Sequence, residues 1–381
     1  CNHLPERRRN RVRDIVLMKV PGNRKERWGF GPAFFFVIAS VNANTALAAE
    51  MFGRFETQLV SEPEPIKTTL SDWGSEFDSG SRQWAISHAE AGFREQGIEV
   101  SVFTRALADL RMNSEAVSFY GRIARKEPLN EGERIPVALR VNGFSGSGIR
   151  SGYRHSEESW TISGGISVFK TRHLMSGTLD GEFVAAAEND YDFSADVDYV
   201  YYRDVIFDRP EVEKASGIGW AFDIAASWQP MEKLDLSFRA EDLFSRIRWK
   251  DAPFTQAQAN TDNKSFDNDG YAVFAPTISG TEGYRDTFYQ DLDPRFYATA
   301  QWQEGSWLTV VHTQYQFGYG LYGVGFGQAL TDGTKLLASY WPELESIQLE
   351  MSRGKWQATV SADDLEWSSV RAIRLGLSYN Y

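Results

Sequence analysis

An alternation of apolar and polar residues runs along most of the chain and restricts its fold more than any other feature. Between Ile218 and Trp228, every second residue is apolar or aromatic, and the positions between them are small or acidic. The alternation resumes from Leu234 to Ala240, after a turn at Pro230. Successive side chains of a strand point to opposite faces of the sheet, so this pattern predicts a hairpin with one apolar and one polar face. Similar segments occur at residues 98–106, 160–168, 193–201, 347–352 and 356–362.

Two architectures produce such strands. A soluble β-sandwich buries the apolar faces between two sheets, whereas a transmembrane β-barrel turns them toward lipid and keeps the polar faces in its lumen. The chain has 25 Phe, 16 Tyr and 12 Trp, and many strands carry aromatics near an end of the apolar face, as Trp220 and Trp228 do. Barrels place aromatics at the two membrane interfaces, and charge in mid-strand suits a wet lumen. The pattern therefore favours the barrel.

The C-terminal segment has an unbroken apolar face that ends on the last residue of the sequence. Its members are Ile373, Leu375, Leu377, Tyr379 and Tyr381. This segment resembles the C-terminal targeting strand of Gram-negative outer-membrane β-barrel proteins. The resemblance implies recognition by the barrel-assembly machinery and a final environment of outer-membrane lipid and lipopolysaccharide. No motif identifies one family within this class.

The N-terminal segment has the features of an export signal. Residues 1–27 contain nine Lys and Arg, residues 33–39 are apolar, and Ala46-Leu47-Ala48 is a small-x-small cleavage pattern. This order predicts a signal peptide that is removed on export, preceded by an upstream extension before Met18. An uncleaved membrane anchor is the alternative. We expect the mature protein to start near Ala49 and to reside in the bacterial outer membrane.

These observations predict an all-β fold, a transmembrane antiparallel up-and-down β-barrel of about 16 strands, with 14 to 18 possible. Residues 1–48 are the extension and signal peptide. Residues 49–80 are predicted to be a polar periplasmic lead-in or lumen segment, and residues 81–381 the barrel. The longest connection is expected between about Arg246 and Asp293, either outside the cell or folded into the lumen.

The charge balance restricts function. Without residues 1–49 the chain has 31 basic and 49 acidic residues, a net charge of −18, and no Cys. This balance argues against a nucleic-acid partner, which usually meets a basic surface. Strand phase places several charged residues opposite the apolar faces, and these are candidates for lining a pore. They are Asp180, Glu182, Asp196, Asp198, Asp223, Asp235, Arg239 and Arg374, with Arg105 and Arg140 as further basic partners.

Three functional classes follow. The first is a porin-like channel or transporter for small cationic or neutral solutes, because acids in a narrow pore concentrate cations. The second is a structural or accessory barrel without a pore, and the third is a lipid-modifying or proteolytic enzyme. No His is followed two positions later by Ser, as in barrel lipases, so we do not expect catalysis. The segment 267–270 fails the EF-hand ligand pattern, and we expect neither a metal nor a cofactor. Both an open and a closed lumen fit the sequence.

Overall fold

The computed structural model describes residues 49–204, 214–261, 264–266, 268, 270–274 and 277–380. The predicted signal peptide and Tyr381 lie outside these residues, as do Asp267 and Asp269. In the described part of the chain, no helix is long and apolar enough to cross a membrane.

Strands make up most of the described chain, with two short helices and one 3-10 turn. The helices are α1 (Ile66–Ser71) and α2 (Ser114–Ala124), and the 3-10 turn is Pro342–Leu344. The strands are β1 (Glu50–Ser61), β2 (Arg82–Glu95), β3 (Ile98–Met112), β4 (Arg134–Ser156), β5 (Trp160–Ala187), β6 (Asp190–Tyr201), β7 (Ser216–Met231), β8 (Leu234–Asn260), β9 (Lys264–Phe266), β10 (Ala272–Phe274), β11 (Thr277–Asp291), β12 (Arg295–Glu304), β13 (Trp307–Gln316), β14 (Tyr319–Ala329), β15 (Thr334–Trp341), β16 (Ser346–Arg353), β17 (Trp356–Ala362) and β18 (Ala372–Asn380).

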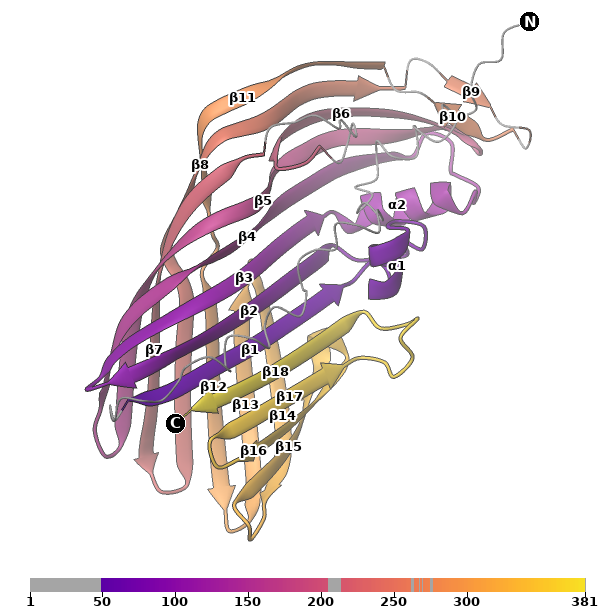
Figure 1. The fold of residues 1–381 in the computed structure, drawn as a ribbon. Coiled ribbons are helices and arrows are strands. Elements are labelled where there is room, and N and C mark those ends of the chain that lie inside the picture. Colours follow the sequence, from indigo (N-terminus) through magenta and orange to yellow (C-terminus); the bar gives the residue numbers. More distant parts are fainter. Residues whose placement is uncertain are drawn as a thin grey trace, which may run out of the picture.

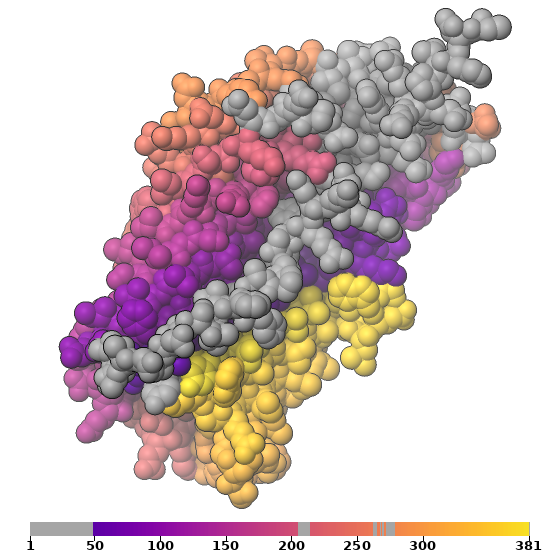
Figure 2. Space-filling model, viewed as in Figure 1, coloured from indigo at the N-terminus to yellow at the C-terminus, as the bar shows by residue number. Residues whose placement is uncertain are grey.

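The strands close into a barrel through antiparallel pairing of the first and last strands. Phe52 of β1 lies opposite Asn380 of β18, and Figure 2 shows the indigo N-terminal strands directly against the yellow C-terminal residues. β6 and β7 lie end to end and share one position in the wall, between β5 and β8. β11 and β12 likewise lie end to end along the other edge of β8. The closed wall therefore has 14 strands, which confirms the predicted fold within its expected range.

The predicted alternation is confirmed on the outside of the barrel. On β7, Ile218 and Trp220 are exposed, while Gly219 and Ala221, which alternate with them, are buried. The same alternation of exposed large apolar residues continues on β5, β14, β16 and β18. An apolar outer face of this kind suits contact with lipid, because a closed antiparallel barrel satisfies its backbone hydrogen bonds internally and has no free edge.

The two ends of the barrel differ in their connections. β1 starts and β18 ends at the same end of the barrel, where Phe52 lies opposite Asn380 (Figure 1). The turns at this end are short, such as residues 96–97 between β2 and β3 and residues 354–355 between β16 and β17. The opposite end carries the longer connections with α1 and α2. Outer-membrane barrels have short periplasmic turns and longer extracellular loops, so we call these the periplasmic and extracellular ends.

Two sequence-based boundaries were wrong. Residues 50–61, predicted to be part of a polar lead-in, form β1 and pair with both β2 and β18. Their inward-facing Arg54, Glu56 and Gln58 made the segment look polar although it is a strand of the wall. The predicted connection Arg246–Asp293 is also mostly strand, because β8 continues to Asn260 and β11 starts at Thr277.

The extracellular ends of β4, β5, β8 and β11, together with β6, form a curved sheet that rises above the rest of the rim (Figure 1). We call this sheet the extension. One of its faces is apolar and packs against α2, where Phe119 stacks on Phe183 at 5.2 Å between ring centroids. By strand register, its other face continues the inner face of the barrel. Strands such as β6 therefore alternate between polar and apolar residues although they lie in the extension, above the lipid-facing part of the barrel wall.

Candidate functional site in the barrel lumen

Charged side chains cross the lumen between opposite walls. Arg54 on β1 donates from Nη1 to Glu241 Oε1 on β8 at 2.9 Å, although five strands separate β1 from β8 along the shorter way around the wall. Glu241 also contacts Arg239 at 3.1 Å and Arg295 at 3.0 Å. Since two walls of the barrel meet through these side chains, the lumen is bridged at this level.

Further contacts extend this bridge. Asp242 on β8 accepts from Arg105 on β3 at 2.5 Å and from Arg295 on β12 at 2.9 Å. Glu56 accepts from Arg54 at 2.5 Å. We call the connected group the belt, and its members are Arg54, Glu56, Arg105, Arg239, Glu241, Asp242 and Arg295.

A second set of ion pairs lies along the wall formed by β2, β3, β4 and β7. Arg150 donates to Asp223 at 2.6 Å and to Glu99 at 3.0 Å, and Arg94 donates to Glu99 at 2.7 Å. Glu90 accepts from Ser101 at 2.5 Å. Acids and bases therefore alternate along this wall, and the inner surface does not carry a single sign of charge.

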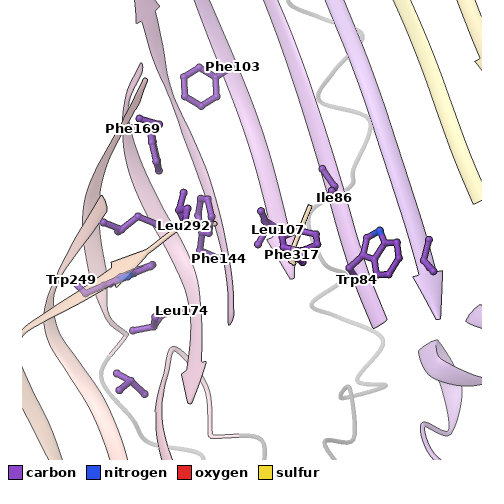
Figure 3. Packing of buried hydrophobic residues seen from close by; sticks show 14 of the residues in the cluster. Trp84, Ile86, Phe103, Leu107, Phe144, Phe169, Leu174, Trp249, Leu292 and Phe317 are labelled. Atoms are coloured by element: carbon purple, nitrogen blue, oxygen red, sulfur yellow. The ribbon is translucent and has the colours of Figure 1, made fainter. Parts of the chain in front are cut away.

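An apolar layer of buried side chains lies inside the barrel next to the belt. It consists of buried side chains that converge from strands around much of the wall (Figure 3). Arg105 of the belt lies against this layer, with its guanidinium carbon 4.2 Å from the ring centroid of Phe169. The labelled members of the layer are Trp84, Ile86, Phe103, Leu107, Phe144, Phe169, Leu174, Trp249, Leu292 and Phe317.

This apolar layer was not predicted from the sequence, although the sequence contains a signal for it. Phe103 and Phe169 fall on the polar side of the alternation in their strands, next to the outward-facing Val102 and Val168. A large aromatic out of phase with the lipid-facing residues points into the lumen. Such residues identify positions where a barrel fills its interior.

A cavity lies on the periplasmic side of the belt. Its volume is about 900 Å³, and we call it the vestibule. Asn380 and residues 157–159 of the β4–β5 turn line its outer end, while Arg54, Glu56 and Arg239 of the belt line its inner end. The lumen therefore has a wide periplasmic half and a filled middle.

The predicted pore-lining residues divide into two groups. Asp223, Asp235, Arg239 and Arg374 lie on the inner face of the barrel. The acids Asp180, Glu182, Asp196 and Asp198 lie instead on the polar face of the extension, above the barrel.

Two of the extension acids have basic partners. Glu182 pairs with Arg134 and Asp198 with Arg285, each at 2.9 Å. Asp180 lies opposite Asp196 across the β5–β6 pair, so two like charges face each other there. The role of all eight residues in passage remains a prediction.

The predicted assembly strand is β18, at the seam where the barrel closes. Leu375 and Leu377 are exposed on its outer face, and Tyr379 contacts the Trp356 ring at 4.8 Å between centroids. Ile373 lies opposite Leu59 of β1. The strand thus presents Leu375 and Leu377 on the outside of the barrel, while its role as an assembly signal stays a prediction.

The closed antiparallel wall, the apolar outer face and the charged interior define a β-barrel of the outer-membrane type. No family model matches the chain, and no curated protein matches it in sequence. The toluene transporter TodX of Pseudomonas putida is 9% identical over 87% of this chain and 90% of its own, with a TM-score of 0.39.

Two further solved structures have lower TM-scores. The toluene transporter TbuX of Ralstonia pickettii is 9% identical over 88% of this chain and 90% of its own, with a TM-score of 0.32. A mutant of the Rh. blastica porin is 10% identical over 88% and 99% of the two chains, with a TM-score of 0.17. At these TM-scores the likeness adds nothing to what the strand pairing of this chain establishes.

Proposed function

We propose that this protein is a gated outer-membrane channel or transporter for small neutral or cationic solutes. It reaches the outer membrane by export with a signal peptide that is cleaved. One observation carries the proposal: the lumen holds a vestibule of about 900 Å³, and buried side chains of the belt and the apolar layer occupy the barrel next to it. Barrels of 8 strands are filled by side chains, whereas barrels of 16 to 18 leave a channel, and a 14-strand wall lies near the second group.

The belt and the apolar layer consist of side chains that can change conformation. Ion pairs between flexible Arg and Glu side chains, such as Arg54 with Glu241, rearrange by rotamer changes without breaking the wall. Apolar constrictions block ions and water by dewetting and conduct when they widen. We therefore assign the belt and the apolar layer as the gate.

The charge distribution supports neutral or cationic solutes. Most arginines in the middle of the lumen are ion-paired with acids, so the greater part of their charge is neutralised. The extension adds Asp180 and Asp196, which are exposed and face each other above the barrel. Carboxylates at a mouth raise the local cation concentration and repel anions.

A closed structural barrel is the second candidate. The contact between Arg54 and Glu241 favours it, because that contact joins distant walls and would stiffen a barrel that conducts nothing. Catalysis forms no part of either proposal.

Swelling of proteoliposomes in an uncharged sugar such as arabinose separates the two candidates. The test compares the wild type with a variant that trims the apolar layer, Phe169→Ala with Trp249→Ala, and with a control that trims the outer face, Ile166→Ala. We expect slow swelling for the wild type and the control, and faster swelling for the double variant. An absence of swelling for all three proteins would contradict the channel and favour the structural barrel.

A further inference from the structure

Arg374 is a charged side chain at the inner end of the vestibule without a carboxylate partner of its own. Among the described residues, no acidic oxygen lies within ion-pair distance of its guanidinium. Its Nη1 donates to Gln348 Oε1 at 3.4 Å and its Nη2 donates to Gln314 Oε1, and both acceptors are neutral amides. The charge of Arg374 is therefore solvated by dipoles but not neutralised.

Two buried donors at this position have no acceptor. Arg374 Nε makes no hydrogen bond within the described part of the chain, and neither does Trp341 Nε1, although Trp341 is 3% exposed. The guanidinium carbon lies 5.1 Å from the Trp341 ring centroid, and both side chains line the vestibule. A buried donor without an acceptor is destabilising, so the pair favours a ligand that brings an acceptor.

The belt beside Arg374 cannot supply the missing charge. The carboxylate that acts electrostatically on Arg374 is Glu56, which is already bound by Arg54 at 2.5 Å and by Arg239 at 3.4 Å. With Arg374 included, this part of the lumen holds five arginines against the acids Glu56, Glu241 and Asp242. An uncompensated buried charge is costly, so an anionic group is expected to bind there.

The vestibule also carries acids that lack a basic partner. Asp235 and Glu350 both line it, and neither forms an ion pair with another described residue. Glu350 accepts from Gln357 Nε2 at 2.7 Å. The vestibule thus holds an unpaired base at its inner end and unpaired acids on its walls.

We propose that Arg374 and Trp341 bind the carboxylate of a small zwitterionic solute, whose cationic end faces the Asp235 and Glu350 carboxylates. A planar guanidinium and an adjacent indole N–H match the two oxygens of a carboxylate. A zwitterion has no net charge, so this inference rests on the proposed function and names the class of neutral solute that the vestibule takes.

Equilibrium dialysis of the detergent-solubilised protein with radiolabelled 5-aminopentanoate tests the site without requiring transport. We expect saturable binding to the wild type and roughly 10- to 100-fold weaker binding to Arg374→Gln, the range expected for loss of a hydrogen bond to a charged group. Pentylammonium, which lacks the carboxylate, should not bind. Arg353→Gln, at an exposed periplasmic turn, is the matched control and should bind like the wild type.

A second variant guards against misfolding. Trp341→Phe keeps an aromatic ring at this position and removes the indole N–H. We therefore expect a several-fold loss of affinity with unchanged heat-modifiable mobility on a gel. Absence of saturable binding to the wild type, equal binding to Arg374→Gln, or equal binding of pentylammonium would overturn the proposal. Absence of binding in a protein that still swells liposomes would remove the site and leave the channel, so the two failures are distinguishable.

Discussion

Glu241 is the side chain on which the bridge across the lumen depends most. It contacts Arg54, Arg239 and Arg295 at 2.9, 3.1 and 3.0 Å, and its side chain is 13% exposed. Glu241→Gln keeps the shape of the side chain and removes its charge. Three arginines then lose a shared counter-ion inside the barrel.

The expected loss of stability follows from burial. Removing one partner of a buried ion pair costs about 3–5 kcal/mol, because the remaining charge is left uncompensated. Arg295 is 4% exposed and carries the full penalty, whereas Arg239 at 31% is partly solvated. Asp242 remains as a partner for Arg295, so we expect the lower end of the range, about 3 kcal/mol.

Urea unfolding of the protein in lipid vesicles measures this loss. Glu304→Gln provides a matched control, because Glu304 pairs with Lys233 at 2.7 Å at an exposed turn. The control should unfold at the wild-type midpoint, while Glu241→Gln should unfold at a clearly lower urea concentration. Adding Arg54→Gln to Glu241→Gln should cost less than the sum of the two single changes, since the residues interact directly. Equal midpoints for Glu241→Gln and the control would refute the bridge.

Three further predictions concern other parts of the chain. Leu377→Asp on the outer face of β18 should lower the amount of heat-modifiable folded protein, and Leu377→Arg should lower it more, because a lipid-facing Arg costs about 2–4 kcal/mol at mid-membrane and less toward the interfaces; unchanged gel mobility of both would contradict the lipid-facing assignment. Burial raises the pKa of Glu64, in the β1–α1 loop, to about 7. The protonated folded form is favoured, so stability should fall as pH rises from about 4.5 to 7 and this fall should vanish in Glu64→Gln, as read by thermal melting. N-terminal sequencing of the outer-membrane fraction should begin near Ala49, and a mature chain that keeps Phe34–Phe36 would exclude cleavage.

The outer face of the barrel could be predicted because lipid imposes the same rule on every strand: each residue that faces lipid, which is every second residue, is apolar. Residues such as Ile218 and Trp220 obey that rule at consecutive odd or even positions, and a period of two is readable in a single sequence. The number of strands was less well defined. Nothing in the alternation indicates that β6 and β7 share one position in the wall, since each reads as a strand of its own.

The interior could be predicted only in part. Strand phase placed Arg239 and Arg374 inside, but the contact of Arg54 with Glu241 joins residues 187 positions apart. No local pattern encodes such a partner, because it depends on how the wall closes. Phase also assigned Asp196 and Asp198 correctly to the polar face, yet it carries no information on height, and these acids lie above the barrel.

Planar-bilayer recording under a KCl gradient tests the gated channel most directly. The account predicts a low resting conductance for the wild type and a larger one for Phe169→Ala with Trp249→Ala, because the apolar layer inside the barrel is thinned. The reversal potential of the open variant should indicate cation preference, weakened by salt, since the Debye length falls to about 3 Å at 1 M. A silent double variant, or a reversal potential that indicates anion preference, would contradict the account.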